Sequence, residues 1–189
     1  MEVRATALPE VKILTPRRFG DARGFFAETW RADRMSEAGL TGGFVQDNES
    51  VSAAAGTLRG LHYQAPPSAQ AKLVRVVHGA IRDVVVDARA GSPHFGRWVA
   101  AELSAETGAQ IFVPRGFLHG FVTLTPDAHV LYKVDAYYDA ACDGSVAWND
   151  PDIGIDWGID PAQAILSDKD RAAPRLRDWN SPFRYEAAA

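Results

Sequence analysis

The stretch from Arg59 to Gln64, R-G-L-H-Y-Q, places a guanidinium, a glycine and an imidazole close together. A guanidinium binds anions, a glycine lets a ligand approach the backbone, and an imidazole accepts a proton near neutral pH. In a regular strand, the two-residue period sends His62 to the face opposite Arg59 and Leu61. The stretch indicates a site that combines anion binding with a base, or else a half-buried histidine with a purely structural role.

Acid–base chemistry at His62 needs a carboxylate that orients the imidazole ring and stabilises its protonated form. Asp87, Asp168 and Asp170 are all available, and their spacing in the sequence does not choose among them. Tyr132 lies in an apolar stretch and is a candidate proton donor; the alternative is a core tyrosine whose hydroxyl is hydrogen-bonded. The residues therefore favour proton transfer and leave the partner of the histidine open.

Several cations are placed where they can bind an anionic ligand. Lys72 begins the apolar stretch 72–77, where partial burial would hold its charge near a ligand; the alternative is a solvated lysine at a strand end. Arg23, Arg59 and Arg115 each neighbour a glycine, as phosphate-binding arginines often do. These residues are consistent with a small anionic ligand.

The local signatures of metal and cofactor sites are missing. The histidines show neither H-x-H, which places two on one strand face, nor H-x-x-x-H, which places two on one helix face. The sequence also lacks a G-x-S-x-G elbow, a G-x-G-x-x-G motif and a P-loop. Cys142 is the single cysteine, lies in a polar turn expected over 139–144, and excludes an intramolecular disulfide. We therefore predict no metal and no cofactor.

Short apolar stretches separated by turns with glycine or proline run through the chain. They predict strands over 5–14, 25–30, 44–52, 72–77, 81–87, 98–103, 110–113, 119–124 and 130–136. One helix is expected over 31–38, ended by Gly39, and a helical turn over 161–164. The pattern between Lys72 and Ala136 contains no helical stretch, which argues against a parallel βαβ arrangement. It predicts an all-β antiparallel sandwich or barrel with a few short helices.

The composition is that of an ordinary globular protein. The 189 residues include 47% hydrophobic and 23% charged residues and carry a net charge of −4, which fits a single domain over residues 1–189. Acids and bases are mixed along the chain, so neither nucleic acid nor an anionic membrane is an expected partner. No apolar stretch reaches membrane-spanning length, and the N-terminus lacks an apolar signal core. We expect a cytoplasmic protein.

Short motifs in a fixed order cover nearly the whole chain. They are F-G-D-x-R-G-F-F-x-E at 19–28, V-Q-D-N-x-S at 45–50, L-R-G-L-H-Y-Q at 58–64, K-L-V-R at 72–75, P-x-F-G-x-W at 93–98, P-x-G-F-x-H-G-F at 114–121, L-Y-K at 131–133, W-N-D at 148–150 and L-S-x-K-D at 166–170. Together and in this order, they resemble the dTDP-4-dehydrorhamnose 3,5-epimerase family.

The resemblance implies a cupin-type jelly roll that works without a metal or a cofactor, as a homodimer that exchanges an N-terminal strand. It also implies the substrate dTDP-4-dehydro-6-deoxy-D-glucose, whose C3 and C5 are inverted on the route to dTDP-L-rhamnose. Both carbons flank the C4 ketone, so loss of a proton from either gives an enolate, and reprotonation on the opposite face inverts the centre. Such an isomerase would use the acid–base residues described above.

The resemblance also implies roles for individual residues. His62 matches the base with Asp170 as its partner, Tyr132 matches the acid, and Lys72 matches the cation that stabilises the enolate oxygen. Substrate contacts match Gln46, Asn48, Arg59, His119 and Lys169, and nucleotide contacts from the neighbouring subunit match Arg23, Phe26 and Glu28. The chain departs from the family at Asp143, a binding position where the family has a glutamate with a longer reach.

Three other functions remain open on the sequence. A sister enzyme that inverts a single carbon, C3 or C5, in another deoxysugar pathway would share His62, Asp170 and Tyr132. A non-catalytic sugar-nucleotide-binding module would not need these three residues together. A metal-dependent cupin oxygenase or isomerase is disfavoured by the missing H-x-H motif.

Overall fold

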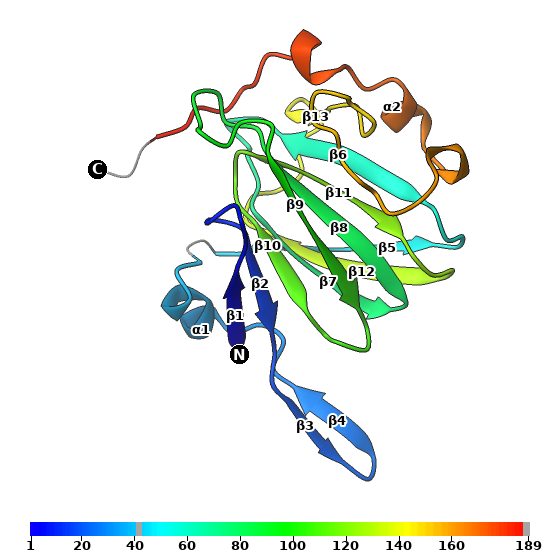
Figure 1. Ribbon diagram of the computed structural model, residues 1–189. Coiled ribbons are helices and arrows are strands. Elements are labelled where there is room, and N and C mark those ends of the chain that lie inside the picture. The colour runs from blue at the N-terminus through cyan, green and yellow to red at the C-terminus, as the bar shows by residue number, and fades with distance from the viewer. Residues whose placement is uncertain (41–42, 187–189) are drawn as a thin grey trace.

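The computed structural model describes residues 1–40 and 43–186. Two antiparallel sheets face each other and form the body of the molecule (Figure 1). In spatial order, the six-stranded sheet contains β1 (Glu2–Ala5), β2 (Lys12–Thr15), β10 (Gln110–Val113), β7 (Lys72–His78), β12 (Ala128–Val134) and β5 (Gln46–Ser52). The five-stranded sheet contains β13 (Asp143–Ser145), β6 (Leu58–Gln64), β11 (Phe117–Thr123), β8 (Ala80–Asp87) and β9 (Trp98–Ser104).

The remaining elements are short. Strands β3 (Arg18–Asp21) and β4 (Gly24–Ala27) pair with each other in a separate hairpin. The helices are α1 (Ala32–Glu37), α2 (Asp168–Arg171) and the 3-10 helices η1 (Pro161–Gln163) and η2 (Leu176–Asp178). The all-β prediction is confirmed, and two packed antiparallel sheets with few helices are the architecture of a cupin-type jelly roll.

One predicted strand and one predicted turn differ from the structure. The strand expected over 5–14 is divided into β1 and β2 by a turn, in which the Thr6 hydroxyl lies 2.8 Å from the Leu8 carbonyl oxygen and 3.0 Å from that of Val11. The polar turn expected over 139–144 contains the start of β13, which pairs Asp143 with Gln64. β13 is short and has no apolar period of its own, so its sequence does not predict a strand. Its pairing with β6 depends on tertiary structure.

The main hydrophobic core lies between the two sheets. Strand alternation directs one side chain in two inward, so both sheets contribute aliphatic residues to this layer. Its buried members are Leu8, Val11, Ile13, Val74, Val76, Ile81, Val85, Leu103, Ile111, Val113, Phe117, Phe121, Ala128 and Val130. Packing of this layer sets the distance between β6 and β11 on one side and β7 and β12 on the other, which are the strands that carry the candidate site.

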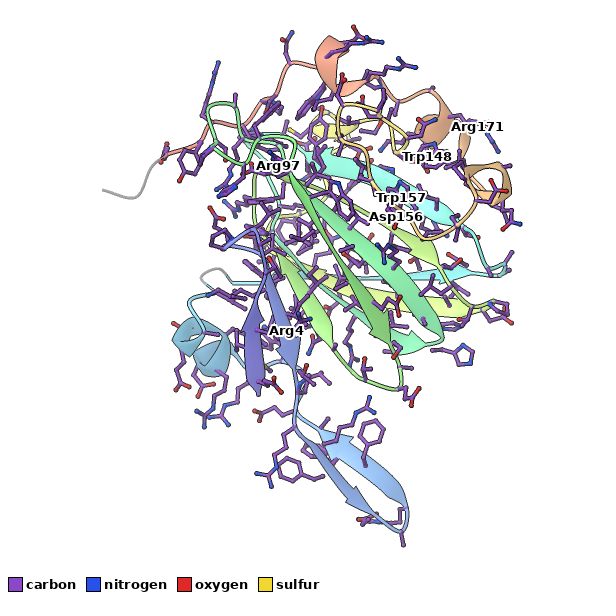
Figure 2. The ribbon with its side chains drawn as sticks, in the orientation of Figure 1. Arg4, Arg97, Trp148, Asp156, Trp157 and Arg171 are labelled. Carbon is purple, nitrogen blue, oxygen red and sulfur yellow. The ribbon has the colours of Figure 1, made fainter. Side chains whose placement is uncertain are left out.

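A second cluster, called the outer cluster here, covers the other face of the five-stranded sheet. The C-terminal segment supplies Trp148 and Trp157, which lie close together over this sheet in Figure 2. The indole nitrogen of Trp157 donates to the carbonyl oxygen of Trp148 at 2.8 Å, so the buried N–H is satisfied. Leu58, Leu61 and Phe183 belong to the same cluster. This packing holds the segment that leads to α2 against β6.

Strand β6 does not keep the alternation that the sequence predicts. Arg59 and His62 both line the same cavity, while Leu61 belongs to the outer cluster. The alternation breaks at Gly60, whose φ of +140° strongly favours glycine. A Cβ at this position would also lie 2.6 Å from the Cα of Gly120 on β11. The prediction that Arg59 and His62 point to opposite faces is therefore wrong, and the break brings both residues into one site.

The β3–β4 hairpin projects away from the two sheets (Figure 1). Its aromatic side chains are largely exposed, at 53% for Phe19, 57% for Phe25 and 71% for Phe26. Large apolar side chains gathered on a projecting segment are typical of a surface that binds a partner. Among the described residues, no helix combines the length and the apolar character needed to cross a bilayer.

Candidate active site

Side chains from both sheets enclose a cavity of about 450 Å³. The five-stranded sheet contributes Arg59, His62 and His119, and the six-stranded sheet contributes Lys72 and Tyr132. The other lining residues are Ser50, Thr57, Leu58, Phe121, Ile165, Leu166, Ser167 and Asp170. The structure therefore brings the residues predicted for catalysis together, along with two of those predicted to bind substrate.

His62 and Asp170 form a hydrogen-bonded pair, with 2.6 Å between Nε2 and Oδ1. The carboxylate side chain is 3% exposed, whereas the imidazole is 30% exposed and reaches the cavity. Because Nε2 faces the carboxylate, it carries the proton of the neutral ring, and Nδ1 is left to accept one. Asp170 is thus the partner that the sequence left open, since Asp168 is exposed and Asp87 is paired with Arg89.

The first turn of α2 holds the Asp170 carboxylate in place. Ser167 is the N-cap residue: its Oγ accepts a hydrogen bond from the Asp170 amide at 3.1 Å and donates to Asp170 Oδ2 at 2.7 Å. Burial raises the pKa of Asp170, but the hydrogen bonds from His62 and Ser167 outweigh it and hold the pKa below its usual range. Asp170 is therefore ionised at neutral pH and can stabilise a protonated His62.

Tyr132 and Lys72 reach the cavity from the sheet opposite His62. Burial raises the pKa of the Tyr132 phenol, and the Arg59 guanidinium partly offsets this, so the phenol keeps its proton at neutral pH. Burial lowers the pKa of Lys72 to about 8, and nearby carboxylates, first among them that of Asp83, act in the opposite direction. A proton donor and a cation therefore lie across the cavity from the histidine.

A smaller hollow of about 160 Å³ shares His62, Lys72 and Tyr132 with the main cavity. Gln46 and Asn48 line it from β5, and Gln46 Nε2 donates to Asn48 Oδ1 at 2.8 Å. These amides can donate to and accept from a polar ligand that extends out of the main cavity. Gln46 and Asn48, for which the family resemblance implies substrate contacts, therefore lie next to the main cavity.

Asp143 and Lys169 meet beside the smaller hollow. Asp143 lines it from β13, and its carboxylate contacts the ammonium of Lys169 on α2. Asp143, where the family resemblance leads us to expect a glutamate, is therefore paired with another predicted binding residue. Tyr138 lines the same hollow and is 61% exposed.

Three further polar contacts orient two residues of the main cavity, Arg59 and His119. Arg59 Nε lies 3.2 Å from the Ser52 hydroxyl, and its Nη2 lies 3.2 Å from the Val51 carbonyl oxygen. His119 Nε2 lies 2.8 Å from Asp83 Oδ2, and both of these side chains are buried. The guanidinium and the second imidazole are thus held in defined positions beside His62.

The nucleotide contacts predicted on the N-terminal segment lie outside this site. Arg23 is exposed at the hairpin turn and pairs with Asp21, Phe26 is exposed on β4, and Glu28 lies 3.5 Å from Arg31. None of the three lines the cavity or the smaller hollow. Within one chain, the structure does not bring them to the site.

Two other predictions from the sequence can be compared with the structure. Arg115, a candidate phosphate ligand, instead pairs with Asp135 at 3.0 Å. Over residues 1–40 and 43–186, no group of three or more histidine, cysteine, aspartate or glutamate side chains is arranged to hold a metal ion. The side chains that line the cavity can support proton transfer, since His62 and Tyr132 lie in it together with the Lys72 cation.

The family model described as dTDP-4-dehydrorhamnose 3,5-epimerase matches residues 5–178. The chain belongs to this family. The dTDP-4-dehydrorhamnose 3,5-epimerase of Sinorhizobium fredii is 49% identical to it, over 98% of this chain and 94% of that protein.

Solved structures agree with this membership in the epimerase family. The crystal structure of dTDP-6-deoxy-D-glucose-3,5-epimerase from Legionella pneumophila, in complex with dTDP-4-keto-L-rhamnose, is 44% identical, covers 98% of this chain and 99% of its own, and superposes with a TM-score of 0.94. A 3′-monoepimerase from Streptomyces bikiniensis, in complex with dTDP-quinovose, is 36% identical over 92% of this chain and 87% of its own, with a TM-score of 0.85. The fold is therefore shared by double and single epimerases.

The sequence did not single out Ser167, Asp83 or Tyr138 as site residues. For Ser167, the spacing S-x-x-D before a short helix is a capping signal that points to Asp170. For Asp83, the signal is an acidic residue inside the apolar stretch 81–87, where a charge needs a partner. Tyr138 lies in a loop without periodicity, and its approach to the site depends on tertiary structure.

Proposed function

We propose that the chain is a cofactor-independent isomerase that inverts C3 and C5 of dTDP-4-dehydro-6-deoxy-D-glucose, in dTDP-L-rhamnose biosynthesis. Membership in the dTDP-4-dehydrorhamnose 3,5-epimerase family supports this activity. The identity of 44% to a 3,5-epimerase in complex with dTDP-4-keto-L-rhamnose supports the substrate class.

The observation that carries the proposal is the placement of His62 and Tyr132 on opposite walls of one cavity. His62 lies on β6 of the five-stranded sheet and Tyr132 on β12 of the six-stranded sheet. A ring bound between them presents one face to an imidazole and the other to a phenol. Removal of a proton from one face and return of a proton to the other inverts the carbon.

Each inversion is one proton exchange with solvent. Nδ1 of His62 takes the proton from the carbon next to the C4 ketone, and Asp170 stabilises the resulting imidazolium. The electron pair moves to the ketone oxygen and gives an enolate, whose charge Lys72 stabilises. Tyr132 returns a proton to the opposite face of the carbon, and solvent restores the protonation of both residues. Inversion at C3 and at C5 repeats this cycle.

Gln46, Asn48, Arg59, His119, Asp143 and Lys169 are the substrate-binding residues in this proposal. Their positions around the cavity and the smaller hollow support contacts to the sugar and the diphosphate. Arg59 supplies a fork of donors suited to a phosphate. Lys169 is placed to add a second cation once a phosphate competes for its contact with Asp143.

The functional unit in this proposal is a homodimer that exchanges an N-terminal strand. The exposed aromatic side chains of the β3–β4 hairpin support a partner surface. Arg23, Phe26 and Glu28 lie away from the cavity of their own chain and would contact the nucleotide in the partner. Residues 1–189 act as one domain in each subunit, and a cytoplasmic location stays a prediction of the sequence.

Proton NMR of dTDP-4-dehydro-6-deoxy-D-glucose in deuterium oxide tests the activity. The expected result is deuterium at both C3 and C5, with inversion detected by trapping the product with a rhamnose-forming reductase. His62→Ala should lower exchange at both carbons by at least about a hundredfold and bind dTDP within a few-fold of the unaltered protein. Exchange and inversion at one carbon alone would assign the chain to the single epimerases, and binding without exchange would leave a sugar-nucleotide-binding module.

A further inference from the structure

Asp83 is a buried acid behind the cavity that the proposed chemistry does not use. It lies in β8 and is 0% exposed. Its Oδ2 accepts a hydrogen bond from His119 Nε2 at 2.8 Å. Among the described residues, its Oδ1 has no hydrogen-bond partner, although this atom is shielded from solvent. A buried carboxylate with one unpaired oxygen is costly, so a nearby positive charge is expected to compensate it.

Lys72 is the cation placed to compensate Asp83. The charges that act on the Lys72 ammonium are those of Asp83 on β8, Asp143 on β13 and Lys169 on α2. The cavity adds four more titratable groups and one guanidinium: His62, His119, Tyr132, Asp170 and Arg59.

Two other carboxylates around the cavity and the smaller hollow, those of Asp143 and Asp170, already have partners. Asp143 contacts the Lys169 ammonium, and Asp170 is bonded to His62 and Ser167. Asp83 is bonded to an imidazole through one oxygen and keeps the other free. Among the described residues, Asp83 is the carboxylate of these three that has a buried oxygen without a partner, so its charge is the least compensated, and it is also the first of the groups that raise the pKa of Lys72.

We propose that Asp83 is a positioning residue that keeps Lys72 charged and fixes which nitrogen of His119 faces away from the sheet. This inference rests on the proposed function, in which a charged Lys72 stabilises the enolate. Asp83 acts through its two neighbours and does not touch the substrate.

The opposing effects of burial on the two groups agree with this coupling. Burial lowers the pKa of Lys72 to about 8, and Asp83 is the first of the groups that raise it. Burial raises the pKa of Asp83 above its usual range, and His119 and Lys72 offset this only in part. Each charge is thus disfavoured alone and favoured by the other.

The same carboxylate sets the tautomer of His119. Because Asp83 accepts from Nε2, the neutral ring carries its proton there, and Nδ1 presents a lone pair. A ligand hydroxyl or a bound water can then donate to His119.

The test is the titration of Lys72 in the absence of substrate. The chain has four lysines, so lysine labelled with carbon-13 at Cε gives few signals, and Lys72→Arg assigns the one of interest. Asparagine has nearly the same volume as aspartate but carries no charge. Asp83→Asn should therefore lower the titration midpoint of Lys72, the pH at which its amino group is half-protonated, by roughly one pH unit or more, the size expected for loss of a nearby opposite charge. An unchanged midpoint in this variant would overturn the proposal.

Asp87→Asn is the matched control, because Asp87 lies on the same strand with the same burial and is bonded to Arg89 instead. The Asp87→Asn variant should leave the titration midpoint of Lys72 unchanged. If this midpoint shifts equally in Asp83→Asn and Asp87→Asn, the cause is a general loss of packing, which would overturn the proposal. Asp83→Glu, which keeps the charge, should restore the midpoint at least in part.

Two measurements on the unaltered protein keep the inference testable if Asp83→Asn fails to fold. The carbon-13 shift of the Asp83 carboxyl should be that of an ionised group at pH 7, and the nitrogen-15 shifts of His119 should show the proton on Nε2. A protonated carboxyl or the other tautomer would contradict the inference. These signals are read without turnover, so they are independent of whether the chain epimerises C3 and C5.

Discussion

The His62 imidazole and the Asp170 carboxylate lie 2.6 Å apart, although 108 positions separate them in the sequence. The contact joins a strand of the five-stranded sheet to a helix of one turn near the C-terminus. It depends on Ser167, which caps that helix and bonds the same carboxylate. The imidazole is therefore oriented by a segment that the outer cluster holds against the sheet.

Ser167→Ala should slow epimerisation more than it weakens binding. The variant loses a hydrogen bond to a charged group, about 1.5–3 kcal/mol, which corresponds to roughly ten- to a hundredfold in kcat if the bond orients the base. KM should stay within a few-fold. Steady-state kinetics check this, and Ser167→Thr, which keeps a hydroxyl, should recover most of the rate. Equal loss in both variants would point to a disturbed helix instead.

Tyr132→Phe should separate proton removal from inversion. The phenylalanine keeps the ring and the packing of Tyr132 against the core but has no proton to return. We expect exchange of deuterium to continue at a reduced rate while inverted product falls by about a hundredfold. Proton NMR measures exchange, and trapping with the reductase measures inversion, in the same sample. Parallel loss of both would argue against a donor role.

The rate should fall as the pH rises above about 8. The pKa of Lys72 is lowered to about 8, so the ammonium is present below this pH and loses its proton above it. The enolate then loses its neighbouring positive charge. A profile of kcat/KM from pH 6 to 10 measures the decline. The Lys72→Met variant has no charge at this position at any pH, so it should be slow, and its kcat/KM should not decline further above pH 8. If the decline persists in this variant, another group causes it.

Gly60→Ala should destabilise the fold by about 3 kcal/mol, from backbone strain and overpacking together. The position has a φ of +140°, and a Cβ would lie 2.6 Å from the Gly120 Cα. Gly91→Ala is the control: it has a φ of +87° but open space around its Cβ, so it should cost roughly 1 kcal/mol. Urea unfolding of both variants gives the difference, and equal costs would show that the contact with β11 is unimportant.

Two inactive chains should complement each other if the hairpin completes the partner's site. A Glu28→Gln chain and a His62→Ala chain, unfolded and refolded together, should recover roughly a quarter of the wild-type sites, because half of randomly mixed dimers are mixed and each holds one intact site. Mixed dimers are verified by two different affinity tags. Verified mixed dimers without activity would place the whole site within one chain.

Much of the fold could be predicted from local pattern. The strands from β7 to β12 and helix α1 carry clear periods and turn residues, and they form close to where they are expected. The family motifs pointed to the residues that line the cavity. What local pattern could not supply was tertiary: the choice of Asp170 over Asp87 and Asp168 depends on how the C-terminal segment crosses β6.

The side-chain directions on β6 could not be predicted for a related reason. A strict two-residue period separates Arg59 from His62, whereas the structure places both in one cavity. The break occurs where Gly60 and Gly120 bring two strands into close approach, and a single strand's sequence does not report its neighbour. The role of Asp83 was likewise hidden, because only the fold places it beside His119.

The projecting β3–β4 hairpin has a consequence for how activity depends on dilution. If its exposed phenylalanines bind a second chain, and if Arg23, Phe26 and Glu28 reach the nucleotide there, each site exists only while two chains are associated. Mass action then makes specific activity fall at low protein concentration. Substrate, by bridging the subunits, would slow that loss, so the enzyme would be most resistant to dilution when it is saturated.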